Sequence, residues 1–171
     1  MEIRELVARA FQRDLSDPSA LSDAFDSIRL LEPENFTLAH ERNKEIRRLS
    51  AKYAAERTDA KMFELNKRSL LFDAPYDFDA AIRYAEWNRE PKKKFYMPRR
   101  KQLLPIVQAM QRLEERNIRI LGVMAPPGIG KTTIELMFMV WTGLKHPELS
   151  SLMGSHSNSF LRGAYEEVGR M

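Results

Sequence analysis

The residues best suited to do chemistry lie in one short run, Ala125-Pro126-Pro127-Gly128-Ile129-Gly130-Lys131-Thr132. This run fits the pattern G-x-x-x-x-G-K-[ST], with Ala125 in place of the first glycine. Gly128 and Gly130 can adopt backbone angles closed to residues with a Cβ, so successive N–H groups can turn inward around a phosphate. Lys131 would reach the β- and γ-phosphates of a nucleoside triphosphate, the Thr132 hydroxyl would bind Mg²⁺, and Thr133 is placed to touch the α-phosphate. The run therefore predicts a phosphate-binding loop.

Two elements must position this loop. Upstream, residues 118–124 form a short β-branched run that is typical of a buried strand. Downstream, Ile134, Met137, Phe138 and Trp141 recur at helical spacing, which predicts a helix whose N-terminus faces the phosphate. A second strand is predicted at residues 149–154, followed by a helix that begins within residues 155–159. Strand, crossover helix and strand make a parallel βαβ unit, so the predicted fold class is α/β with an incomplete parallel sheet.

The sequence predicts a helical N-terminal region over residues 1–90. It predicts the start of a nucleotide-binding domain over residues 91–171. Apolar stripes at helical spacing cover residues 3–11, 21–31 and 38–57, and further helices are expected at 59–70 and after Asp77 or Asp79. Another helix is predicted from Pro98 to Arg116. These stripes indicate packing rather than chemistry.

Composition narrows the class of protein. The chain has 171 residues, 43% of them hydrophobic and 30% charged, which suits a globular protein. It has no cysteine, which excludes disulfides and thiolate metal sites and makes a cytoplasmic setting the expectation. No apolar run reaches the length of about 18 residues that a membrane span needs. The three histidines show no metal-ligand spacing.

The positive charge is concentrated in the second half of the chain. Residues 1–90 carry a net charge of −3, and residues 91–171 carry +7. Six of the ten residues from Lys92 to Lys101 are basic. This basic segment can be a solvated linker or a nucleic-acid contact. A third interpretation is that its helix delivers Gln102 to an adenine edge, with Tyr96 or Phe95 against the ring.

Three segments together resemble the start of the large terminase subunit of tailed phages, the ATP-driven motor that packages DNA into a procapsid. They are residues 86–91 with residues 95–105, which include Phe95-Tyr96-Met97-Pro98-Arg99-Arg100-Lys101-Gln102, then residues 124–133, then Ser155-His156-Ser157 leading into a predicted helix. The resemblance covers rather more than half of the chain. It implies ATP and Mg²⁺ as cofactors, with Lys131 as a catalytic contact, Thr132 on the metal and Gln102 on adenine.

The resemblance also implies partners: double-stranded DNA, a portal protein, a small terminase subunit and further copies of the chain, in the host cell cytoplasm. Family members often carry a basic residue inside the loop, and residues 126–129 have none. Arg162 is a candidate for an arginine that acts on a neighbouring subunit. No carboxylate after Lys131 ends a four-residue apolar strand, and no nuclease motif follows. We therefore expect an N-terminal portion of the motor, inactive as an ATPase by itself.

Two alternatives stay open at this stage. The chain can belong to another DNA-translocating ATPase of helicase type, since a glutamine motif and a phosphate loop recur there. It can also be a helical interaction module with a vestigial loop. Nucleotide binding by the isolated chain separates this last class from the other two.

Overall fold

The computed structural model describes residues 2–148 together with residues 150, 152, 154, 162, 163 and 166. The chain forms two compact units, which divide between Asp73 and Ala74. The boundary predicted from the sequence lies later, after residue 90, because the basic segment begins near that point.

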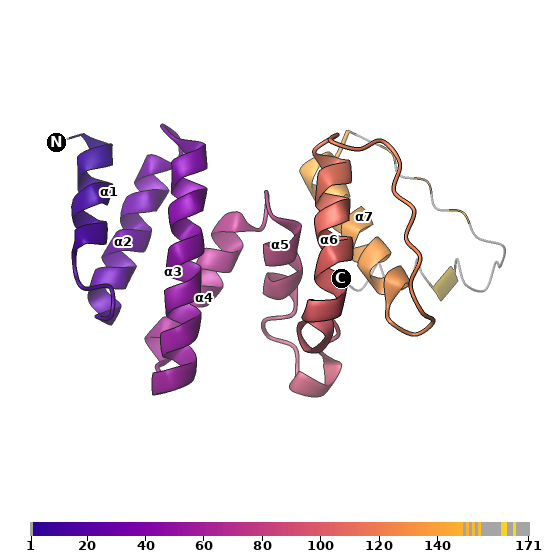
Figure 1. Ribbon diagram of the computed structural model, residues 1–171, viewed down its shortest axis with the longest axis horizontal. Coiled ribbons are helices and arrows are strands. Elements are labelled where there is room, and N and C mark those ends of the chain that lie inside the picture. Colours follow the sequence, from indigo (N-terminus) through magenta and orange to yellow (C-terminus); the bar gives the residue numbers. More distant parts are fainter. Residues whose placement is uncertain are drawn as a thin grey trace. The chain divides into compact units, whose positions relative to one another are not determined.

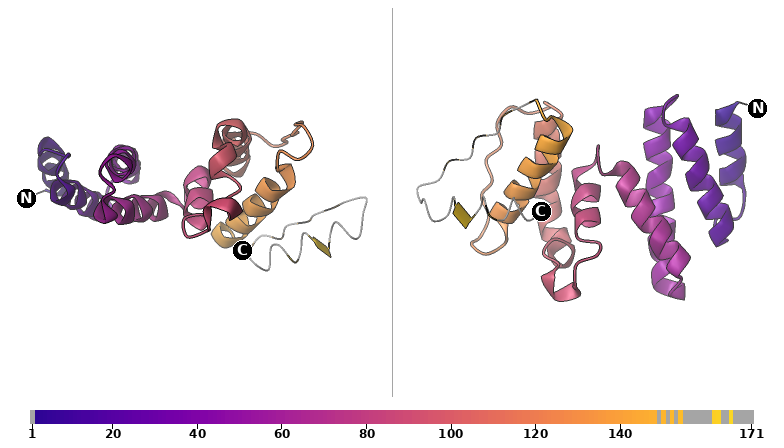
Figure 2. Two further views of the ribbon diagram at one scale, coloured as in Figure 1. Left: turned by 90° about the horizontal axis from the view of Figure 1, so that it is seen from below. Right: turned by 180° about the vertical axis from the view of Figure 1, so that it is seen from behind.

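The first unit consists of four helices packed as neighbours along the chain (Figures 1 and 2). They are α1 (Ile3–Gln12), α2 (Pro18–Leu31), α3 (Phe36–Arg57) and α4 (Ala60–Asp73). The apolar stripes predicted from the sequence form their contact faces. The core comprises Val7, Ala10, Leu21, Ala24, Phe25, Ile28, Leu31, Ala39, Ile46, Ala54, Met62 and Leu65.

The helix starts in this unit follow ordinary capping chemistry. Asp17 precedes α2 and accepts hydrogen bonds from the N–H groups of Ser19 and Ala20, and Pro18 occupies the first helical position. Asn35 precedes α3 and accepts from the Leu38 N–H at 3.1 Å. These caps satisfy donors that have no partner inside the helix.

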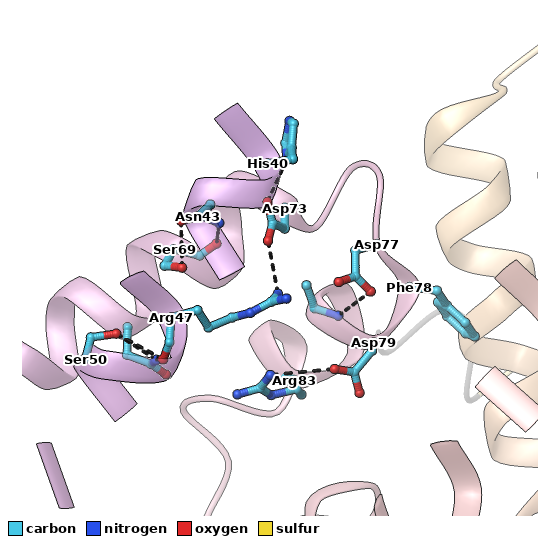
Figure 3. A network of polar contacts seen from close by, with 12 residues as sticks. His40, Asn43, Arg47, Ser50, Ser69, Asp73, Asp77, Phe78, Asp79 and Arg83 are labelled. Carbon is cyan, nitrogen blue, oxygen red and sulfur yellow. Dashed lines mark hydrogen bonds and ion pairs between the residues drawn. The ribbon is translucent and has the colours of Figure 1, made fainter. Parts of the chain in front are cut away.

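Buried polar side chains tie α3 to α4 (Figure 3). Asp73 is 2% exposed and accepts from His40 at 2.6 Å, while its other oxygen pairs with Arg47 at 3.2 Å. Asn43 and Ser69 exchange hydrogen bonds between the same two helices. Since each of these groups is withdrawn from water, the contacts specify the register of α3 against α4.

The second unit contains three α-helices and two short 3₁₀ turns. These are α5 (Phe78–Ala85), η1 (Pro91–Lys93), η2 (Met97–Arg99), α6 (Arg100–Glu114) and α7 (Lys131–Lys145). Asp77 caps α5 through the Ala80 N–H (Figure 3). The core of the unit comprises Phe78, Ile82, Tyr96, Leu103, Val107, Met110, Ile134, Met137 and Trp141.

The predicted α/β fold is wrong. The described residues form seven α-helices and no strand. Residues 118–124 do run extended between α6 and α7 (Figure 1), but Ile120 is 90% exposed and Met124 is fully exposed. A strand is stable only where a neighbour pairs with its N–H and C=O groups. No described segment provides that pairing.

The remaining sequence predictions of structure fall at the end of the chain. Within the second predicted strand, Ser150, Leu152 and Gly154 have no regular secondary structure, and the other three positions lie outside the described residues. The helix start predicted within residues 155–159 also lies outside them. In the part of the chain that the structure describes, no helix is both long enough and apolar enough to span a membrane.

Candidate phosphate-binding loop

The backbone of the loop turns at two glycines. Gly128 has φ +75° and Gly130 has φ +99°, both in the left-handed region that side chains disfavour. Ile129 lies between them and packs its side chain against the core of the second unit. Alternation of this kind brings neighbouring N–H groups to one side of the chain and makes an anion-binding concavity.

Lys131 folds back over the loop. Its ammonium donates hydrogen bonds to the carbonyl oxygen of Ala125 and, at 3.1 Å, to that of Pro126. These carbonyls lie six and five residues before the lysine, so the side chain spans the whole glycine turn. The arrangement holds a positive charge at the loop.

The loop leads directly into α7. Gly130 is the N-cap residue, and Ile134 is the first residue whose N–H donates to it, at 3.2 Å. The N–H groups of Lys131, Thr132 and Thr133 precede that bond and have no carbonyl partner within the helix. They lie at the positive end of the helix dipole, where an anion is stabilised.

An aromatic side chain from an upstream segment leans on the loop. The Phe95 ring lies so close to Gly130 that a Cβ at position 130 would overlap it. The guanidinium of Arg99 lies 5.3 Å above the centroid of the same ring. Glycine at position 130 is thus required twice, for its backbone angle and for this contact.

A buried carboxylate holds the segment that carries Phe95. Glu86 is fully buried, and its two oxygens accept from the N–H groups of Phe95 at 2.7 Å, Tyr96 at 2.8 Å and Met97 at 3.1 Å. Charge-assisted bonds of this kind are stronger than neutral ones. Three convergent donors satisfy the carboxylate and fix the turn.

Asp79 anchors the next residues of the same segment. It accepts from the Tyr96 hydroxyl at 2.6 Å and from Arg100 at 2.8 and 2.9 Å. Figure 3 shows its ion pair with Arg83, at 3.6 Å. Burial raises the pKa of the Asp79 carboxyl, but the bonds from Arg100 and Tyr96 outweigh burial and leave the pKa below its ordinary 3.8. Burial and the bond to Asp79 raise the pKa of the Tyr96 hydroxyl, which stays protonated.

The sequence-predicted site residues divide into two groups. The structure brings Ala125, Pro126, Pro127, Gly128, Ile129, Gly130, Lys131, Thr132 and Thr133 together as one turn and helix start. Gln102 lies exposed on α6, and no described contact links it to the loop. Arg162 is helical and exposed, and no described contact links it to the loop either.

Tyr96 and Arg100 bind Asp79 and do not have the roles that the sequence suggested for them. Tyr96 is fully buried and bonded to Asp79, so its ring is not available to an adenine. Arg100 is held by Asp79, whereas Lys92, Lys93, Arg99 and Lys101 are exposed. The free basic charge is therefore smaller than the sequence run implies.

Glu86 and Asp79 were missed as parts of the site. Their spacing of seven puts them on one side of a short helix, with Arg83 between them, and that spacing was the available signal. The hydrogen bonds from these two carboxylates to residues 95–100 leave no periodic pattern in the sequence.

Among the described residues, no group of three or more histidine and acidic side chains is placed to hold a metal ion.

Comparisons of this chain with protein-family models, with curated proteins and with solved structures found no match.

Proposed function

We propose that residues 125–133 bind the phosphates of a nucleoside triphosphate with Mg²⁺. The observation that carries this proposal is the coincidence of three features at one place. The loop turns at two left-handed glycines, the Lys131 ammonium lies over that turn, and α7 begins there with unpaired N–H groups. Each feature alone is common, and together they suit a polyphosphate.

Each residue has a definite role in this proposal. When a nucleotide binds, the Lys131 ammonium would exchange its two carbonyl partners for oxygens of the β- and γ-phosphates. These bonds would be stronger because both partners are charged. The N–H groups between Gly128 and Thr133 donate to the same anion. Thr132, half-buried at the start of α7, offers its hydroxyl to the metal. When bound, Mg²⁺ would offset the charge of the phosphate oxygens.

The residues present fit a phosphate group. A Cβ at Gly128 would meet no atom within 4 Å, so the outer side of that turn is open to a ligand. The loop has no acidic residue, and the nearest in sequence is Glu135, on α7. Nothing in the loop itself therefore repels a polyanion.

The wider proposal is that the chain is the nucleotide-binding portion of a terminase-like DNA-packaging motor, acting in the cytoplasm of an infected cell. Its support is the order of the resembling segments in the sequence, together with the contact between Phe95 and Gly130. That contact places the residue 86–105 segment beside the loop. Double-stranded DNA, portal protein, small subunit and other copies of the chain are the partners that the resemblance implies.

Calorimetric titration with Mg-ATP tests the proposal. Lys131→Ala removes a charged hydrogen-bond donor, so its affinity should fall by about 10- to 100-fold. Lys61→Ala, which removes an exposed lysine of the first unit, is the matched control and should bind as the wild type does. Equal affinity in the wild type and Lys131→Ala would refute the loop as the site, and a chain that binds no Mg-ATP would refute the proposal altogether.

A further inference from the structure

The phosphate loop is poorly supported by its own backbone. No backbone–backbone hydrogen bond joins residues 119–126 to any described residue. The turn at Gly128 and Gly130 is therefore held by side chains: Leu121 and Ile129 on the core, Lys131 on two carbonyls, and the ring of Phe95.

Phe95 differs from the other supports because it is itself held from outside the loop. Its N–H donates to Glu86, and the following residue, Tyr96, is buried and bonded to Asp79. The two carboxylates belong to α5 and its C-cap. The ring therefore links Gly130 to α5, whereas the hydrogen bonds of Lys131 are made to carbonyls of the loop itself.

We propose that Phe95, fixed by Glu86, is a positioning residue of the phosphate-binding loop. This inference rests on the proposed function. The ring closes the side of Gly130 against which the loop would otherwise collapse, and it keeps the left-handed turn that directs the N–H groups. A loop already in its binding conformation loses less conformational entropy when a ligand arrives.

The variants separate positioning from general stability. Phe95→Ala removes the ring, and Phe95→Leu restores an apolar side chain of similar reach. Met97→Ala is the matched control, because Met97 is a 42% exposed apolar residue of the same turn whose N–H still binds Glu86. Glu86→Gln removes the charge and turns an amide group toward one of the three donors.

Three quantities are measured on the full chain. Titration with Mg-ATP should show affinity about threefold to tenfold weaker in Phe95→Ala, partly restored in Phe95→Leu and unchanged in Met97→Ala. Hydrogen exchange without nucleotide should show faster exchange of the Ile134 amide, which donates to Gly130, and of the following amides in the first turn of α7, in both Phe95→Ala and Glu86→Gln. The melting temperature is recorded alongside, because Phe95 also packs against the core of the second unit and its loss should lower the melting temperature more than Met97→Ala does. Both other measurements are made well below either melting temperature.

The outcomes distinguish the two proposals. If Lys131→Ala weakens binding and Phe95→Ala does not, the positioning role is overturned and the phosphate site stands. If the wild type binds no Mg-ATP but Phe95→Ala speeds exchange of the Ile134 amide and of the first turn of α7, the ring supports the loop while the proposed function fails. Unchanged exchange in Phe95→Ala overturns the positioning role whatever the nucleotide result.

Discussion

At the scale of residues, the second unit depends on two carboxylates with different tasks. Glu86 accepts only backbone N–H groups and fixes a turn. Asp79 accepts side-chain donors and balances the charge of Arg100. Both are nearly or fully buried, and a buried charge is tolerated only when its partners satisfy it. Removing the donors that satisfy either carboxylate should therefore lower the free energy of unfolding.

The depressed pKa of Asp79 predicts how its contribution depends on pH. The folded pKa lies below the ordinary value of 3.8, so the ionised form stabilises the fold at all pH values above that. Asp79→Asn should lower the free energy of unfolding by about 2–4 kcal/mol at pH 7. The difference from wild type should shrink as the pH falls below 3.8 through the folded pKa.

Chemical denaturation at several pH values checks this prediction. Glu34→Gln is the control, because that carboxylate is exposed, and its effect should stay within about 0.5 kcal/mol. A difference between Asp79→Asn and wild type that is equally large at pH 7 and at pH 2.5 (roughly one unit below the ordinary Asp pKa) would show that the charge of Asp79 is not what stabilises the fold.

At the scale of elements, the sequence predicted the helices and failed on the strands. Helices α1 to α6 carry their apolar stripes within single segments, and caps such as Asp17 and Asn35 mark where two of them begin. A strand needs a partner from elsewhere, and a β-branched run such as residues 118–124 cannot supply one by itself. The loop was visible as a motif, whereas the bonds of Glu86 and Asp79 to residues 95–100 were not, because each joins a carboxylate of α5 or its C-cap to a group in a later, non-helical segment or helix start.

The proposal that double-stranded DNA is a partner depends on the basic segment. Lys92 and Lys93 are exposed on η1, and Lys94 follows half-buried. If these lysines contact phosphates of duplex DNA, binding should weaken steeply with salt, because each contact releases counterions. Reversing all three to glutamate should lower the slope of log K against log salt by about 2–3.

Fluorescence titration of labelled duplex DNA at several salt concentrations measures that slope. The control reverses Lys44, Lys52 and Lys61 instead, which are exposed lysines of the first unit. The same loss of slope in both triple variants would indicate a nonspecific charge effect. No change in either would return the basic segment to the role of a solvated linker.

At the scale of the whole molecule, the net positive charge and the candidate phosphate-binding residues lie in the same half of the sequence. The half that contains the loop and the basic segment carries +7, while residues 1–90 carry −3. The first unit has its own core and its own buried polar network, and no residue assigned to phosphate binding belongs to it. Nucleotide binding should therefore change the second unit alone.

Hydrogen exchange of the full chain with and without saturating Mg-ATP reports where on the chain the ligand binds. We expect protection of the amides from Gly128 to Ile134, where the glycine turn meets α7, and unchanged exchange in α1 to α4. In Lys131→Ala the protection should disappear at the same nucleotide concentration. Protection that leaves residues 128–134 untouched, or that survives the loss of Lys131, would contradict the assignment of this loop as the phosphate site.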